Sequence, residues 1–190
     1  MRASLATTPE LQRSLERFYH LEARLLDSRH YQQWLSLVSQ AISYSLPSRT
    51  NPLVDNRLRG SESMISIDNE LERSDSSGCP IREEGYIHLM LRVERAFKMN
   101  SWSENPPART RRIIGNIELM ADTDEGLEVW SNFHLHYARP GVRDALYSGQ
   151  RRDLLLTDSS ATTMADYTIA RREVILDYAD IQLPTVGLLF

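Results

Sequence analysis

Two histidines in the second half of the chain resemble part of a metal site. His134 and His136 are separated by one residue, and an alternating apolar and polar pattern predicts that both lie on one face of a β-strand. Glu128 and Asn132 fall on the same face, so the set resembles the two-histidine, one-carboxylate arrangement of mononuclear iron sites. Because this spacing fixes little ligand geometry, we interpret the histidines as solvent or subunit contacts and predict no metal site.

A second group of titratable residues lies near the N-terminus and could carry acid–base chemistry. Its members are His20, Glu22, Asp27, His30 and Tyr31. At the mouth of a cavity, a histidine and a carboxylate from this group could abstract a proton from a small substrate. Glu22 and Asp27 can equally be exposed or helix-end residues that cap and form ion pairs. We favour this second interpretation, because only the residue types suggest a catalytic role.

Two arginine-rich segments could bind phosphate groups. They are Arg109-Thr-Arg-Arg112 and the pair Arg151 and Arg152. Strand alternation splits each segment across two sheet faces, and no aromatic residues are interleaved on the same face, as a nucleic-acid platform would require. We therefore expect these arginines to pair with acidic residues on neighbouring strands or on a partner chain.

The composition excludes several classes of protein. One cysteine, Cys79, is too few for a disulfide framework, a four-thiolate zinc site or a self-contained iron–sulfur cluster. The excess of 26 acidic over 22 basic residues argues against a general nucleic-acid binder. There is no phosphate-binding glycine loop and no nucleophile elbow. We find no apolar run of about 18 residues and no signal peptide, so we expect a cytoplasmic protein without a membrane segment.

The elements that must position these residues are predicted from hydrophobic periodicity. Helices are expected over 10–27, introduced by Thr8 and Pro9, over 30–39 and over about 81–98. A short strand at 42–46 follows the first two helices. Residues 48–78 are interpreted as a long excursion with one strand at 63–67.

The remainder of the sequence predicts an antiparallel sheet. Four long strands are expected over 112–120, 127–137, 147–156 and 167–178. In the second of these the apolar face comprises Leu127, Val129, Ser131, Phe133, Leu135 and Tyr137. We predict an α+β fold with a strongly curved, mostly antiparallel sheet and about three helices on one face. The length suggests an N-terminal arm over 1–9 and one domain over 10–190.

Several segments resemble the small (beta) subunit of bacterial aromatic-ring-hydroxylating dioxygenases, in its biphenyl and toluene branch. The resemblance extends from about residue 10 to residue 190 and is weakest over 56–81. It is carried by Glu22-Ala-Arg-Leu-Leu-Asp27, Tyr31, Trp34-Leu35, Tyr44 to Pro47 with Arg49-Thr50, Trp102-Ser-Glu-Asn-Pro-Pro-Ala-Arg-Thr-Arg-Arg112 with Asn116, Gly149-Gln-Arg-Arg-Asp153, Ala170-Arg-Arg-Glu-Val-Ile-Leu-Asp177 and an apolar end at Leu-Leu-Phe190.

This resemblance implies a cystatin-like, or nuclear-transport-factor-like, cone. It also implies a non-catalytic subunit that assembles with a large (alpha) subunit, as three large and three small chains. The large subunit of such an enzyme carries a Rieske [2Fe-2S] cluster and a mononuclear Fe(II). There an aromatic hydrocarbon becomes a cis-dihydrodiol, with electrons delivered from NAD(P)H through a reductase and a ferredoxin. The resemblance assigns no catalytic, cofactor or metal residue to this chain.

A structural subunit needs surfaces that bind its partner. Aromatic and amphipathic side chains commonly anchor interfaces, and the contact residues predicted here are Trp102, Arg109, Arg111, Trp130 and His134. The alternative function is a stand-alone isomerase or dehydratase with the same cone shape and a histidine–carboxylate pair. That alternative requires His20, Asp27 or His30 to point into a closed apolar cavity.

Overall fold

A computed structural model describes residues 7–74, 78–157, 167–180, 183–185 and 187–190. Three α-helices occur in these ranges: α1 (Pro9–Asp27), α2 (Tyr31–Leu35) and α3 (Tyr86–Arg95). The strands are β1 (Val38–Leu46), β2 (Ser48–Arg49), β3 (Leu71–Glu72), β4 (Arg82–Glu84), β5 (Arg109–Thr123), β6 (Gly126–Arg139), β7 (Val142–Thr157) and β8 (Tyr167–Leu176). Most of the predicted N-terminal arm, and residues 158–166 between the last two predicted strands, lie outside the described residues.

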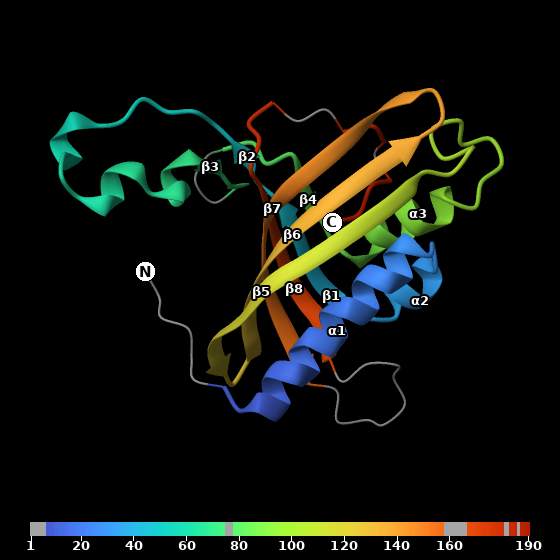
Figure 1. Ribbon diagram of the computed structural model, residues 1–190, viewed down its shortest axis with the longest axis horizontal. Coiled ribbons are helices and arrows are strands. Elements are labelled where there is room, and N and C mark those ends of the chain that lie inside the picture. The colour runs from blue at the N-terminus through green and yellow to red at the C-terminus, as the bar shows by residue number, and fades with distance from the viewer. Residues whose placement is uncertain (1–6, 75–77, 158–166, 181–182, 186) are drawn as a thin grey trace.

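The main sheet has the strand order β4-β1-β8-β7-β6-β5. Among the described strands of this sheet, only β1 and β8 pair in parallel, and the other neighbours are antiparallel. The long strands β5, β6 and β7 cross the molecule as a twisted, curved layer, and the helices gather on one side of it (Figure 1). The predicted α+β cone with a mostly antiparallel sheet is therefore confirmed.

Helix α1 is fixed at both ends by local backbone chemistry. The Thr8 hydroxyl accepts a hydrogen bond from the Leu11 amide at 3.2 Å, and Pro9 occupies the first turn, where a missing N–H costs nothing. At the other end Arg29 adopts a left-handed φ of 60°, a conformation that more commonly uses glycine. The Arg29 side chain then donates to the carbonyl of Ala108 at 3.0 and 2.9 Å, which ties the helix end to the start of β5.

The core lies between the helices and the inner face of the sheet. The predicted inner face of β6 is buried throughout, including Val129, Phe133 and Leu135. The last residues of the sequence enter the same space, and Phe190 is fully buried against Phe133 and Tyr147, with ring centroids 5.9 and 5.7 Å away. The interior of the cone is therefore packed with side chains.

The excursion between β1 and α3 projects away from the rest of the molecule (Figure 1). It is closed by the short ladder between β2 and β3. The strand predicted at 63–67 is wrong, because this region forms the 3-10 helices Glu62–Ile65 and Ile67–Glu70. Local hydrogen bonds explain the difference: the Ser61 hydroxyl accepts from the Ser63 amide, and the Asn69 amide donates to the Ser63 carbonyl.

The second and third helices are shorter than predicted because neighbouring residues join the sheet. Helix α2 ends at Leu35, since β1 begins at Val38. Helix α3 begins only at Tyr86, since Arg82–Glu84 pairs with Tyr44–Leu46 as β4, a strand too short to show periodicity. No helix in the described part of the chain combines the length and the apolar character needed to cross a membrane.

Candidate functional site

The most unusual feature of the interior is a cluster of four buried charges. Glu22 from α1 lies among Arg151 and Asp153 from β7 and Arg172 from β8, and each of the four residues is at most 2% exposed. Two carboxylates face two guanidinium groups, so the cluster is formally neutral. The expectation that Glu22 is an exposed or helix-end residue is wrong. Its position four residues after Phe18 places it on the apolar stripe of the helix.

Every carboxylate oxygen in this cluster accepts a hydrogen bond. Trp34 Nε1 donates to Glu22 Oε1 at 3.0 Å, and Arg151 Nη1 donates to Oε2 at 2.9 Å. Arg172 bridges the two acids, with its Nε 2.9 Å from Asp153 Oδ1 and its Nη2 3.1 Å from Glu22 Oε2. The Tyr19 hydroxyl donates to the remaining oxygen, Asp153 Oδ2, at 2.8 Å.

The electrostatics of the cluster match this pairing. Burial alone would raise the pKa of Glu22, but Arg172 and Arg151 outweigh it and lower the pKa of that carboxyl to about 2. Burial likewise acts to lower the pKa of Arg172, whereas Asp153 and Glu22 raise it well above its ordinary value. The ionised Glu22 carboxylate, with both oxygens engaged, is a poor general base, so the cluster is a structural ion-pair network.

The other members of the predicted acid–base group do not come together. Asp27 accepts from the Arg112 amide at 2.8 Å and from the Thr110 hydroxyl at 3.0 Å, and it forms an ion pair with the Arg112 guanidinium. His20 and His30 are exposed to solvent. An isomerase or dehydratase of this shape would need His20, Asp27 or His30 to point into a closed apolar cavity. The two histidines instead face solvent, and Asp27 is engaged by Arg112 and Thr110.

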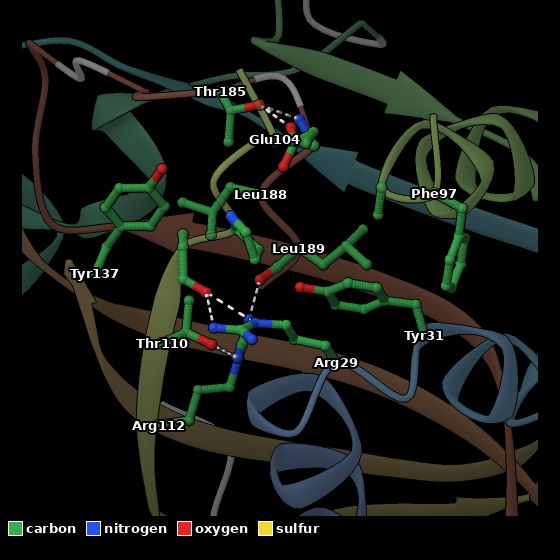
Figure 2. Close-up of a pocket in the computed structure, with 14 residues that line it drawn as sticks. Arg29, Tyr31, Phe97, Glu104, Thr110, Arg112, Tyr137, Thr185, Leu188 and Leu189 are labelled. Carbon is green, nitrogen blue, oxygen red and sulfur yellow. Dashed lines mark hydrogen bonds between the residues drawn. The ribbon is translucent and has the colours of Figure 1, made fainter. Parts of the chain in front are cut away.

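A small cavity, which we call the mouth pocket, lies beside the start of β5 and the C-terminal segment (Figure 2). Its volume is about 190 Å³, and its walls include Arg29, Tyr31, Phe97, Glu104, Tyr137 and Leu188. Helices, the start of β5 and the C-terminal segment all contribute to it. Burial raises the pKa of Tyr31 and of Tyr137, so both phenols are neutral hydrogen-bonding groups at neutral pH.

Four of the five predicted interface residues share one surface. Arg109 and Arg111 from β5 and Trp130 and His134 from β6 point to the outer face of the sheet, opposite the core. Trp102 lies elsewhere, in the segment that precedes β5, and it is 79% exposed. Whether any of the five contacts a partner stays a prediction.

The predicted splitting of the arginine segments across two faces is confirmed. Arg112 and Arg151 are buried, whereas Arg111 and Arg152 lie on the outer side. Arg152 lies opposite Trp130 on the neighbouring strand and stacks on its ring, with the guanidinium carbon 4.5 Å from the centroid, so the expectation that no aromatic residue shares the face of these arginines is wrong. Arg152 also lies 3.3 Å from Asp68. As predicted, acidic residues neutralise the buried arginines, although the partners Glu22 and Asp27 come from α1 and not from a neighbouring strand.

The residues that resemble part of a metal site lie on the outer face of the sheet. His134 and His136 face outward from β6, and Glu128 pairs with Arg171. Within the described ranges, no group of three or more histidine, cysteine, aspartate or glutamate side chains is arranged to hold a metal ion. Cys79 is free and exposed.

Comparisons with known proteins identify the family. The family model described as "Ring hydroxylating beta subunit" matches residues 21–183. The chain is 29% identical over 191 residues to the benzene 1,2-dioxygenase subunit beta of Pseudomonas putida F1, covering 100% of this chain and 94% of that protein. It is also 29% identical over 174 residues to the biphenyl 2,3-dioxygenase subunit beta of Rhodococcus jostii RHA1, covering 91% of this chain and 85% of that protein.

The fold has the same relatives. A chain of naphthalene 1,2-dioxygenase, in a structure with indole bound in the active site, superposes with a TM-score of 0.78 at 23% identity, covering 100% of this chain and 90% of that chain. This likeness in fold agrees with the family match over most of the sequence. The chain belongs to the ring hydroxylating beta subunit family and is the non-catalytic beta subunit of a ring-hydroxylating dioxygenase.

Proposed function

We propose that this chain is the structural component of an oxygenase that converts an aromatic hydrocarbon to a cis-dihydrodiol. The observation that carries the proposal is the family match over residues 21–183, combined with full-length similarity to a benzene dioxygenase subunit. The large subunit would hold a Rieske [2Fe-2S] cluster and a mononuclear Fe(II). A reductase and a ferredoxin would deliver the electrons from NAD(P)H. We place the complex in the cytoplasm and treat residues 10–190 as one domain.

The residues of this chain do not fit either iron group. A Rieske cluster needs two thiolates and two imidazoles, and the sequence has one cysteine. The exposed pair His134 and His136 has no acidic side chain placed beside it as a third ligand in the described part of the chain. All iron chemistry therefore belongs to the large subunit, and the contribution of this chain is assembly.

The outer face of the sheet is our proposed contact with the large subunit. Apolar side chains are exposed on it, with Ile113 at 70% and Leu146 at 53%. Cross-strand pairing places Arg111, His136 and Leu146 in one row and Ile113 and His134 in the next. A mixed apolar and cationic surface of this kind is typical of protein interfaces. Its arginines would attract an acidic surface on the large subunit and fix how the two surfaces align.

The edge of the sheet supports the same assignment. In the described residues β5 pairs only with β6, so one side of this strand has no strand neighbour. A long free edge invites pairing with other chains unless another surface covers it. Three large and three small subunits arranged around a threefold axis would cover both the edge and the outer face.

One experiment tests whether iron binding and arene oxidation require the large subunit. The chain is purified alone and together with its large subunit, and iron content and arene oxidation are measured for both samples. We expect less than one iron per ten chains in the isolated subunit and no turnover, on the ligand-count argument above. Stoichiometric iron in the isolated chain would reject the proposal.

A second experiment tests the contact surface. Arg111→Glu reverses a charge on the outer face, on the edge strand β5, and Arg17→Glu makes the same change at an exposed position on α1. We expect Arg111→Glu to weaken assembly with the large subunit at least tenfold in sedimentation velocity, because like charges across an interface cost several kcal/mol. Equal assembly of the two variants would contradict the proposed surface. Trp102→Ala tests separately whether the segment before β5 contributes to assembly with the large subunit.

A further inference from the structure

We propose that residues 50–70, which we call the projecting loop, bind the large subunit as a continuation of the outer face of the sheet. The loop extends away from the helices and the sheet and returns to them through the ladder of β2 and β3 (Figure 1). This inference rests on the proposed function, because that function supplies the partner.

The projecting loop leaves its apolar side chains in solvent. No described side chain between residues 50 and 70 is buried. Leu53 is 98% exposed and Ile65 72%, and Val54 and Ile67 are exposed as well. Exposed apolar side chains that lie together, with polar residues around them, are typical of a surface that another protein covers.

Most of these side chains gather around one hollow in the projecting loop. Its volume is about 310 Å³, and Leu53, Val54, Met64 and Ile65 are among the residues that line it. A hollow with apolar walls can accept a side chain of a partner protein. Anchors of this kind commonly supply most of the binding energy of an interface.

Local hydrogen bonds hold the projecting loop in this shape. The Thr50 amide donates to the Glu70 carbonyl at 2.8 Å across the base of the loop. Nearer its tip, Asn69 Nδ2 donates to the Ser63 carbonyl at 2.8 Å. A segment that already has a fixed shape loses less conformational entropy when it binds. The exposed apolar side chains are therefore presented to a partner in a defined arrangement.

Ion pairs attach the base of the projecting loop to the sheet. Asp68 Oδ1 lies 3.3 Å from Arg152 Nη1 on β7, and the Arg152 guanidinium stacks on Trp130 of β6. Glu70 Oε2 lies 2.7 Å from Arg49 Nη2 on β2. Because Trp130 is one of the predicted interface residues, these contacts place the base of the loop against the proposed contact surface.

A groove joins the projecting loop to the outer face. Its volume is about 270 Å³; Ile67 lines it from the loop, and Asn132, His134 and Ser148 line it from β6 and β7. A partner that covers the outer face at His134 therefore also meets the loop at Ile67. Since the proposed function assigns the outer face to the large subunit, we infer the same occupant for the projecting loop.

Removing apolar contact from the projecting loop tests the inference. The loop variant carries Leu53→Ser and Ile65→Ser. The matched control carries Leu91→Ser and Ile87→Ser, at positions 50% and 65% exposed on α3, which lies far from the loop (Figure 1). We expect the loop variant to weaken assembly of the full chain with its large subunit at least about tenfold in sedimentation velocity, and the control to assemble like the parent. Both variants should keep the thermal unfolding midpoint of the parent, because the replaced side chains are at least half exposed.

Hydrogen exchange measured by mass spectrometry gives a readout that needs no substitution. We expect peptides from residues 50–70 to exchange more slowly in the assembled complex than in the isolated chain. The inference is overturned if the loop variant and the control assemble equally, or if exchange over 50–70 does not change on assembly. It is also overturned if exchange over 50–70 slows as the concentration of the isolated chain rises, since a second copy would then be the occupant. In each of these cases the parent still assembles with its large subunit, whereas a parent that fails to assemble overturns the proposed function as well.

Discussion

Replacing Glu22 by glutamine should destabilise the protein by several kcal/mol. The substitution leaves Arg151 and Arg172 facing only Asp153, so a buried positive charge loses its partner. Removing one member of a buried ion pair typically costs about 3–5 kcal/mol. The pKa of Glu22 gives a similar magnitude. The difference between an ordinary value of 4.5 and about 2, at about 1.4 kcal/mol per pH unit, corresponds to about 3.5 kcal/mol.

The same pKa fixes how this contribution depends on pH. The folded protein holds the Glu22 carboxyl ionised at a lower pH than the unfolded chain does, so the unfolded chain binds the proton first. The contribution is fully present above about pH 4.5 and is lost as the pH falls from 4.5 towards 2. The parent protein should therefore lose its advantage over Glu22→Gln across this interval.

Urea unfolding at pH 7 and at several values down to pH 3 measures both effects. Glu16→Gln, at a partly exposed position on the same helix, is the matched control and should change the free energy of unfolding by less than about 0.5 kcal/mol. Adding Arg151→Gln to Glu22→Gln restores neutrality, so the double variant should lose less than the sum of the two single losses. A cost below about 1 kcal/mol for Glu22→Gln, or strict additivity, would refute the assignment of this cluster as a coupled network.

Three further substitutions probe the fold. Gly149→Ala should cost at least about 2 kcal/mol in urea unfolding, because an added Cβ would lie 2.2 Å from the Ile175 carbonyl oxygen. Gly115→Ala is its control, since a Cβ there meets nothing within 4 Å, and equal losses would count against the close approach of β7 and β8. Phe190→Ala empties a fully buried site and should cost about 3–5 kcal/mol by the same measurement. An unchanged midpoint would mean that the C-terminal segment is not part of the core. Asp27→Asn leaves the buried Arg112 without its carboxylate and should cost about 3 kcal/mol in calorimetry, and a loss like that of Glu16→Gln would disprove the pairing.

The elements that follow a single period could be predicted from the sequence. The alternation along β6 separates Val129, Phe133 and Leu135 from Trp130 and His134, and the structure buries the first set and exposes or half-exposes the second. Period-2 alternation depends only on which residues share a face, so it requires no knowledge of distant partners. The start of α1 is equally local, since Thr8 and Pro9 act within one turn.

Short or irregular segments could not be predicted in this way. Strand β4 has three residues and exists only because β1 pairs with it. The 3-10 helices at 62–65 and 67–70 follow from serine and asparagine side chains bonding to nearby backbone, a pattern that apolar periodicity does not detect. Their apolar residues Ile65 and Ile67 resemble strand residues in the sequence, yet both are exposed.

The sequence by itself was enough to predict the long strands and the helices, to reveal the family resemblance and to exclude the thiolates that an iron–sulfur cluster needs. Only the tertiary structure decided the roles of the charged residues. Glu22 is separated from Arg151 by 129 positions and from Arg172 by 150, so nothing local indicates that they neutralise one another. Likewise, Asp27 pairs with Arg112, which lies 85 positions further along the chain. Burial and charge pairing depend on which distant segments the fold brings together, and a one-dimensional pattern does not carry that information.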